Sequence, residues 1–205
     1  RFTEFLKPDY IILTNFFRDQ LDRYGEIEGI IGEVLDDISL LPDAKLIINC
    51  DDPFVNQFSR KLPNPMIKFG LDINSTGVKE ENLIMNKCPL CGGKLNYTKY
   101  VYGHLGDYYC SDCGFNNDEK DYRIVEVNAY NSSQEIVIKH DKNTYRINFP
   151  YTGLYNTYNV CATFALANEI GLDMNECVNS METFEFSLGR MEEFTYKDKK
   201  VKVVL

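Results

Sequence analysis

The sequence lacks several features that would each indicate a class of function. Lysine and arginine together number 22 against 31 aspartates and glutamates, which gives a formal net charge of −9. No segment forms a basic stripe of the kind that binds a phosphate backbone, so we expect no nucleic-acid partner. No apolar run approaches the roughly 20 residues that cross a bilayer, so the sequence predicts neither a transmembrane segment nor a signal peptide.

Histidine is scarce, and one phosphate-binding motif is missing. The two histidines, His104 and His140, lie in no catalytic arrangement, and we predict that both are surface residues. The chain has no Gly-x-x-x-x-Gly-Lys-Ser/Thr sequence, so the loop and lysine that cradle nucleotide phosphates in many ATPases are absent from it. We therefore assign no catalytic residue within these 205 residues.

Cysteine, by contrast, is patterned. Cys88 and Cys91 form one Cys-x-x-Cys pair, and Cys110 and Cys113 form a second. The two residues inside each pair let both sulfurs face one metal, and a glycine follows each pair where a tight turn with positive φ is favourable. This spacing predicts a structural zinc ribbon over residues 84–121, a closed site that performs no chemistry. Two disulfides, four unligated thiols, or iron in place of zinc are the alternatives.

The remaining totals are those of a globular protein. A chain of 205 residues, 44% hydrophobic and 26% charged, can bury one core with a small insertion. Cys50, Cys161 and Cys177 lie in apolar or helical contexts and are expected to be reduced core residues, which indicates a reducing cytoplasm. The chain begins in mid-pattern at Arg1 and ends in an apolar run, so we expect it to be part of a longer protein.

The pattern of apolar residues predicts an α/β fold with a mainly parallel sheet. Buried strands are expected at residues 10–13, 45–49 and 66–70, with helices at 27–41 and 54–62 between them, which is the spacing of βαβ units. Alternating segments then predict an antiparallel meander appended to that sheet. Its strands are expected at residues 122–127, 134–140 and 144–149. Strands at 94–102 and 106–109 are expected inside the ribbon, and helices at 153–170 and 174–184, the last capped by Asp173.

Polar residues gather where these elements begin or end. Asn15 follows the first strand, at the sheet edge where α/β proteins bind ligands. Asn156 and Asn159 are three apart at the start of a helix, so both side chains can point the same way. Helix capping explains one of these asparagines well, and the presence of a second allows a role in binding a ligand. Arg190 lies in a glycine-containing loop, where it could hold a phosphate or pair with a neighbouring glutamate.

Four motifs in order carry a resemblance to a known family. They are Thr14-Asn15 with Asp-Gln-Leu-Asp at 19–22 and Gly25, Asn-Cys-Asp-Asp at 49–52, Gly-Leu-Tyr-Asn-Thr-Tyr-Asn at 153–159, and Gly-Arg-Met-Glu at 189–192. With them the chain resembles the central, ATP-binding domain of the Mur ligases over residues 1–205. The resemblance implies a P-loop NTPase-like α/β fold, with Asn156 and Asn159 near the adenine and ribose. It also implies that Asn15 approaches the nucleotide, that Arg190 approaches the ribose or phosphates, and that Asp51 and Asp52 are structural.

The Cys₄ insertion narrows the resemblance. A Mur ligase-like domain with such a ribbon is similar to the ligase subunits of lipid II isoglutaminyl synthases. In that family the ligase uses ATP and magnesium to activate the D-glutamate α-carboxylate of lipid II as an acyl phosphate. A GatD-like glutamine amidotransferase subunit supplies the ammonia that forms D-isoglutamine. The resemblance thus implies peptidoglycan synthesis in the cytoplasm, at the inner face of the membrane.

The sequence departs from the Mur pattern in two places. Gln20 stands where the family often has a magnesium-binding histidine, and residues 32–35 (Gly-Glu-Val-Leu) lack the lysine that other members use as its carbamate. These departures suit ammonia, rather than an amino acid, as the acceptor. The family also places its phosphate loop upstream and its closing domain downstream, so we expect this chain alone not to turn over ATP. An amino-acid-adding Mur or folylpolyglutamate-type ligase, or a non-catalytic zinc-ribbon module that binds proteins, are the alternatives.

Overall fold

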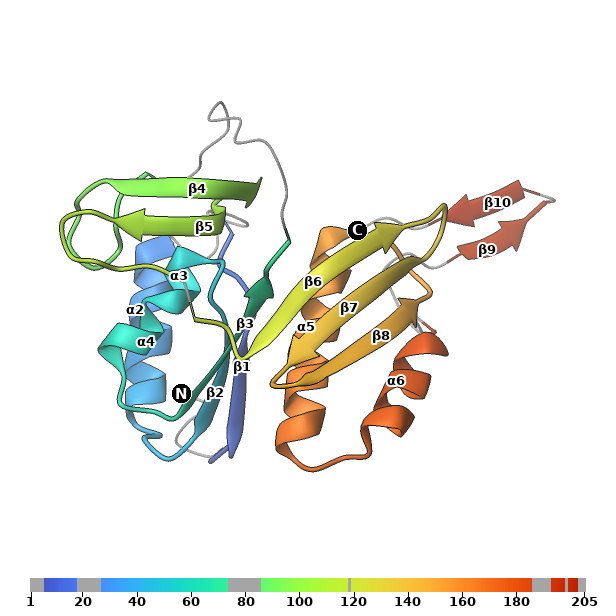
Figure 1. Cartoon of the computed structure of the whole chain (residues 1–205), viewed down its shortest axis with the longest axis horizontal. Helices are drawn as coiled ribbons and strands as arrows, with labels where there is room; N and C mark the ends of the chain where they lie inside the picture. Colours follow the sequence, from blue (N-terminus) through green and yellow to red (C-terminus); the bar gives the residue numbers. More distant parts are fainter. Residues whose placement is uncertain are drawn as a thin grey trace.

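A six-stranded mixed sheet forms the centre of the molecule (Figure 1). The computed structural model describes residues 6–17, 27–73, 86–117, 119–185, 193–197 and 199–202. The first four strands of the sheet run parallel. The fourth of them also pairs with the fifth strand, and the fifth with the sixth, to form an antiparallel meander. Their order is β1 (Tyr10–Leu13), β2 (Lys45–Asn49), β3 (Met66–Leu71), β6 (Tyr122–Ala129), β7 (Gln134–His140) and β8 (Asn143–Phe149).

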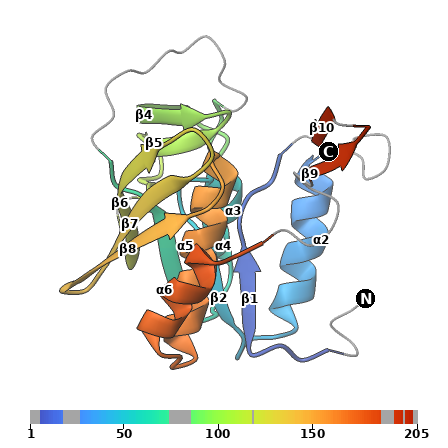
Figure 2. The same cartoon turned by 90° about the vertical axis from the view of Figure 1, so that its right-hand side faces the viewer.

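Helices cover both faces of the parallel strands, and β2 shows why. Leu46, Ile47 and Ile48 of β2 are all fully buried. Successive side chains of a strand point to opposite faces, so Leu46 and Ile48 pack with α2 (Ile27–Ser39), α3 (Pro53–Asn56) and α4 (Phe58–Lys61). Ile47 joins the core on the other face, under α5 (Leu154–Glu169) and α6 (Met174–Glu182). Figure 2 shows α2 and α5 on opposite sides of β1.

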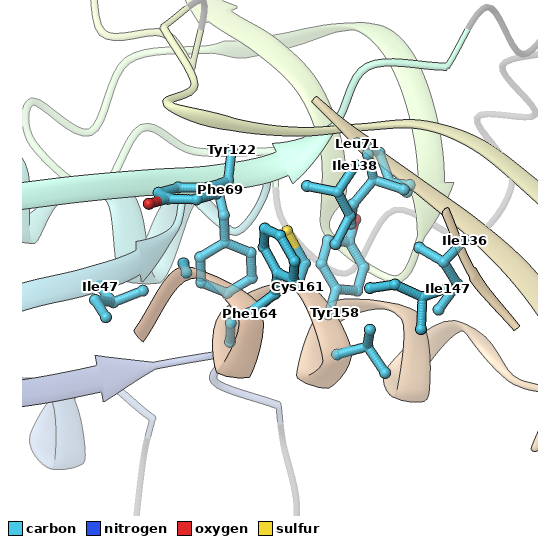
Figure 3. Packing of buried hydrophobic residues seen from close by; sticks show 14 of the residues in the cluster. Ile47, Phe69, Leu71, Tyr122, Ile136, Ile138, Ile147, Tyr158, Cys161 and Phe164 are labelled. Atoms are coloured by element: carbon cyan, nitrogen blue, oxygen red, sulfur yellow. The ribbon is translucent and has the colours of Figure 1, made fainter. Parts of the chain in front are cut away.

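The larger core lies between the sheet and α5 (Figure 3). Tyr158, Cys161 and Phe164 on one side of the helix meet Phe69 and Tyr122 of the central strands, among others. All five of these side chains are at most 2% exposed. Complete burial of a phenylalanine such as Phe69 or Phe164 stabilises the fold by about 1.5–3 kcal/mol, and this packing fixes α5 against the strands.

A hairpin of β4 (Leu95–Tyr102) and β5 (Leu105–Cys110) forms a separate two-stranded sheet, inserted between β3 and β6. It lies across the end of the parallel strands, beside α3 (Figure 1). The hairpin has a small core of its own, which consists of Cys88, Leu95, Tyr108, Cys110 and Phe115. A further pair, β9 (Glu193–Tyr196) and β10 (Lys199–Lys202), follows α6.

The predicted fold class and the order of the predicted strands are confirmed. The helix expected at 54–62 is instead two short helices, α3 and α4, that meet at Gln57, and the helices expected to end at 41 and 184 end at Ser39 and Glu182. Asp173 caps α6 as expected, because its carboxylate accepts the backbone N–H of Asn175 at 2.8 Å. None of the helices in the described ranges is long and apolar enough to span a bilayer.

Candidate functional site

The candidate nucleotide residues lie at the carboxyl edge of the parallel strands. α5 runs antiparallel to these strands, since Tyr158 near its start donates to Asp51 after β2, with an O···O distance of 2.9 Å. At the other end of the helix the carbonyl of Glu169 accepts from Tyr10, the first residue of β1. The start of α5 and the residues that follow β1 therefore share one edge. That edge brings Asn15 and Asn156 to the same end of the sheet.

Asn156 and Asn159 line one groove between α5 and α6. Asn156 is 3% exposed, and its side-chain amide donates to the carbonyl of Thr152 at 2.8 Å, whereas Asn159 is exposed. The groove has a volume of about 490 Å³. Its wall is largely apolar, and Asp173 and Glu176 add two carboxylates. The apolar lining comes from Phe149, Val160, Ala167, Leu172, Met181 and Phe184.

The other two predicted nucleotide residues are Asn15 and Arg190. Asn15 is exposed in the segment directly after β1, but the groove between α5 and α6 does not include it. Arg190 lies outside the described residues, as do the motifs at 19–22 and 189–192. The structure thus joins two of the four predicted nucleotide residues in one groove. It places a third at the same edge of the sheet.

Asp51 lies at the centre of a buried polar network that sequence reasoning missed. One carboxylate oxygen accepts the N–H of Leu71 at 2.6 Å and the hydroxyl of Tyr158, and the other is 3.1 Å from the ammonium of Lys120. Burial raises the pKa of Asp51, and the charge of Lys120 opposes that rise. A Cβ at Gly70 would lie 2.5 Å from this carboxylate, so glycine is required there. The predicted structural role of Asp51 fits these contacts.

Asp52 is also buried and holds three segments together. One of its oxygens caps α3 by accepting the N–H groups of Phe54 and Val55, at 2.8 and 3.3 Å. The other accepts the N–H of Phe16 at 2.8 Å and lies 3.1 Å from Nε2 of His104. The side chain of Asp52 thereby ties the segment after β1 to the start of α3.

The prediction that both histidines are surface residues is wrong. His104 is fully buried, because the turn between β4 and β5 packs onto the sheet edge beside Asp52. His140 is half-buried, and its ring stacks on Tyr122 with 4.0 Å between centroids. A hairpin turn is normally exposed, and nothing local in the sequence marks the partners of the His104 ring, because Phe17, Asp52 and Phe54 are all distant along the chain.

The four cysteines of the two Cys-x-x-Cys pairs converge as predicted. Their Sγ atoms all lie within 4.8 Å of one another, and Sγ of Cys88 is 3.6 Å from Sγ of Cys113. Cys91 and Cys110 are separated by the same distance. A disulfide would need about 2.05 Å, whereas tetrahedral zinc at about 2.3 Å from each sulfur separates the sulfurs by about 3.8 Å. The cluster therefore has the geometry of a four-sulfur metal site.

The glycines after each pair confirm the expected turns. Gly92 and Gly114 have φ values of 74° and 71°, in the left-handed region that favours glycine. The N–H of Gly93 also donates to Sγ of Cys91 at 3.4 Å. Hydrogen bonds from backbone amides stabilise thiolates, so these turns suit sulfurs that bind a metal.

Comparisons with known proteins agree with this arrangement. Residues 1–89 match the Mur ligase middle domain. The whole chain is 34% identical to the MurT subunit of the glutamine-hydrolyzing lipid II isoglutaminyl synthase of Streptococcus pneumoniae, and 97% of it is 29% identical to the Staphylococcus aureus subunit. The chain spans 45% and 44% of the lengths of these two relatives.

Solved structures show the same fold. A pseudomurein peptide ligase type C from Methanothermus fervidus superposes with a TM-score of 0.78 at 25% identity, over 97% of this chain and 38% of that one. The MurF ligase of Thermotoga maritima, solved in complex with ADP, superposes with a TM-score of 0.62 at 12% identity. The second match covers 98% of this chain and 36% of that one, and it supports the fold alone.

Proposed function

This chain belongs to the Mur ligase family through its middle domain, and from that premise we propose that it is the nucleotide-binding part of a lipid II amidating ligase. The enzyme would convert the D-glutamate α-carboxylate of the lipid II stem peptide to D-isoglutamine. It would act in the cytoplasm, at the inner face of the membrane, together with a GatD-like glutaminase subunit. These are properties of the whole enzyme, of which the chain is one part.

The observation that carries the proposal is the Cys₄ ribbon built into the sheet edge of a Mur ligase middle domain. The likeness to MurT subunits extends over the whole chain, ribbon included. In addition, α2 (Ile27–Ser39) contains no lysine, so the described helix offers no residue for the carbamate of the amino-acid-adding ligases. Zinc is the metal that suits the closed set of Cys88, Cys91, Cys110 and Cys113, and its role would be structural.

The reaction would proceed in two steps. A carboxylate oxygen attacks the γ-phosphorus of ATP, which gives an acyl phosphate and ADP. Ammonia then attacks the acyl carbon, and the C–O bond to phosphate breaks as the amide forms and a proton is lost. Magnesium, when bound, offsets charge on the phosphates, and Gln20 could offer it a carbonyl oxygen.

The residues of this chain would bind and orient the nucleotide. Asn156 and Asn159 would hold the adenine and ribose from the groove between α5 and α6. Asn15 would approach the nucleotide from the end of β1, and Arg190 would contact the ribose or phosphates. Asp51 and Asp52 stay structural, because their oxygens are occupied by the contacts described above.

The test uses the full-length protein with its glutaminase partner, lipid II, ATP, magnesium and glutamine. Mass spectrometry should show conversion of one acid to an amide, dependent on both ATP and the partner. An Asn159→Ala variant should raise the KM for ATP about 5–10-fold through loss of one hydrogen bond. Asn179→Ala, at an exposed position of α6 that does not line the groove, is the matched control and should leave KM unchanged.

Two other outcomes would overturn the proposal. ATP-dependent addition of an amino acid would return the protein to the amino-acid-adding Mur or folylpolyglutamate-type ligases. If neither reaction occurs and partner binding is retained, a non-catalytic binding module is favoured. The 205-residue chain alone should give no ATP turnover, because its sequence contains no Gly-x-x-x-x-Gly-Lys-Ser/Thr loop.

A further inference from the structure

The turn between β4 and β5 reaches the sheet edge that carries Asn15. Tyr102 pairs with Leu105 across the hairpin, so Gly103 and His104 form a two-residue turn. Gly103 has φ of 64°, which suits a glycine at the first turn position. Through this turn His104 becomes fully buried at the carboxyl edge of the parallel sheet, next to Asp52.

His104 contacts the segment that follows β1. We call residues 14–17 the exit segment. The ring of Phe17 in this segment lies 4.7 Å from the ring of His104 and 6.0 Å from that of Tyr102. On its other side His104 meets Phe54 of α3 at 5.0 Å, edge to face. The tip of the hairpin is therefore packed between the exit segment and α3.

Asp52 links His104 to the backbone of the exit segment. The same carboxylate oxygen lies 3.1 Å from Nε2 of His104 and accepts the N–H of Phe16 at 2.8 Å. Phe16 also stacks on Phe58 of α4, with 6.0 Å between centroids and an interplanar angle of 11°. The exit segment is thus held on both sides of its backbone, and Asn15 comes directly before the anchored amide.

Packing alone does not explain a histidine at this position. Neither ring nitrogen of His104 makes a hydrogen bond with any residue in the described ranges, although both are buried. Within this described part of the chain, Nδ1 has no polar contact and Nε2 has only its 3.1 Å approach to Asp52, and burying a polar atom without a hydrogen bond is unfavourable by about 1–3 kcal/mol. An apolar side chain of similar volume would fill the space between Phe17 and Phe54 without that penalty. Such an apolar side chain could not make the polar contact with the Asp52 carboxylate.

We propose that His104 is a positioning residue, which acts through Asp52 and Phe17 to hold the exit segment so that Asn15 meets the nucleotide. The inserted ribbon is then more than a folding support, because its tip completes the nucleotide site from outside the parallel sheet. The ordering of the segment stands on the contacts alone, while its consequence for nucleotide binding rests on the proposed function.

The first test measures the segment itself, without nucleotide, by hydrogen exchange of the Phe16 amide in the full-length protein. His104→Ala should accelerate this exchange at least about tenfold, the equivalent of about 1.4 kcal/mol in local opening. His104→Leu keeps the packing volume and loses the contact with Asp52, so it should accelerate exchange as well. Unchanged exchange in both variants would overturn the proposal.

Phe115→Leu is the matched control. Phe115 is buried in the ribbon core, where its ring lies 5.5 Å from that of Tyr108, and among the described residues it makes no ring contact with the exit segment. This variant should weaken packing in the ribbon core while the metal cluster and the hairpin tip stay in place, and so leave the exchange of Phe16 near the wild-type rate. Acceleration equal to that of His104→Ala would reduce His104 to a contributor to ribbon stability and would overturn the proposal.

The second test measures ADP affinity in the full-length protein by calorimetry. His104→Ala should weaken ADP binding about fivefold in the wild-type background, and hardly at all when Asn15 is already alanine, because coupled residues are not additive. Equal weakening in both backgrounds would overturn the route through Asn15. A wild-type protein that does not bind ADP would defeat the proposed function, and the exchange test would still decide whether His104 orders the segment.

Discussion

Asp51 and Asp52 are consecutive residues, yet their carboxylates serve different elements. Asp51 contacts Lys120 at the end of the ribbon, Tyr158 on α5 and the backbone of β3. Asp52 caps α3 and anchors Phe16 after β1. Buried carboxylates are stable only when such partners satisfy them. Two adjacent side chains therefore fix the positions of five segments around the candidate nucleotide edge.

Asp107 of β5 should make stability depend on pH. It lies 2.9 Å from the ammonium of Lys120 and 3.2 Å from that of Lys99. Burial favours its neutral form, but the two lysines outweigh burial and lower the pKa of Asp107. A lowered pKa in the folded state adds stability above the usual carboxyl pKa of about 3.9, and this stability is lost as pH falls through the folded value.

Asp107→Asn should therefore reduce the free energy of unfolding by about 1 kcal/mol at neutral pH, after allowance for partial exposure. The difference from wild type should shrink as pH falls below about 4, where the wild-type carboxylate also becomes neutral. Urea unfolding at several pH values measures this difference. Asp43→Asn, at an exposed position, is the control and should show no such pH dependence. A constant difference across the pH range would contradict the assignment.

At this scale the sequence predicted which residues come together where they are close along the chain. The cysteine pairs and their glycines carry their own spacing, and Asn156 and Asn159 are a helical turn apart. His104 and Lys120 were missed because their partners are distant along the chain. Lys120 pairs with Asp51, and His104 contacts Asp52 at the carboxyl edge of the sheet. Spacing predicts a site only where the ligands are neighbours in sequence.

α6 forms one wall of the groove that contains Asn156 and Asn159, and its start depends on a single side chain. The carboxylate of Asp173 accepts the N–H groups of Asn175 and Glu176, at 2.8 and 3.1 Å. Loss of an N-cap of this kind costs about 1 kcal/mol. Asp173→Ala should lower the free energy of unfolding by about that amount and raise amide exchange in the first turn of α6.

Asp173→Ser is the matched variant, because serine caps helices almost as well as aspartate. It should restore most of the stability lost in Asp173→Ala. If serine is as destabilising as alanine, the charge of Asp173, rather than its hydrogen bonds, stabilises this helix. Hydrogen exchange of α6 separates these two results, because only a lost cap raises exchange at Asn175 and Glu176.

At the scale of elements, the strands of the main sheet were predicted within two residues of their ends. Their signals were continuous apolar runs in the parallel part and strict alternation in the meander, and both follow directly from which faces are buried. The division at Gln57 between α3 and α4 was missed. Phe54 and Phe58 both face the core, so the apolar pattern continues through the break and does not reveal it.

At the scale of the whole molecule, two of the contacts between the ribbon and the sheet lie next to the candidate nucleotide edge. The hydroxyl of Tyr108 donates to the carbonyl of Cys50 at 2.9 Å, and the N–H of Gly106 donates to the carbonyl of Asp51 at 3.0 Å. The turn with His104 forms the second contact, against Asp52 and the exit segment. A change at the four cysteines can therefore reach the candidate nucleotide edge through β5 and the hairpin tip.

Replacement of Cys88 and Cys91 by serine should remove the metal and loosen the ribbon first. The ribbon core is small, so it depends on the metal, whereas the six-stranded sheet buries its own larger core. Hydrogen exchange should increase across residues 86–117, while β2, β3 and β7 stay protected. The Phe16 amide should also exchange faster, because the hairpin tip no longer holds the exit segment. Metal analysis should show loss of one bound ion per chain.

Cys177→Ser is the control for this experiment, since Cys177 is a half-buried thiol of α6 outside the cluster. It should keep the metal and the protection of the ribbon. If the serine variants instead lose protection across ribbon and sheet in one transition, the two parts fold as a single unit. If the ribbon opens while Phe16 stays protected, the tip is not what holds the exit segment. If the ribbon loosens and Phe16 exchanges faster while the sheet stays protected, the metal site stabilises the nucleotide edge through the hairpin tip.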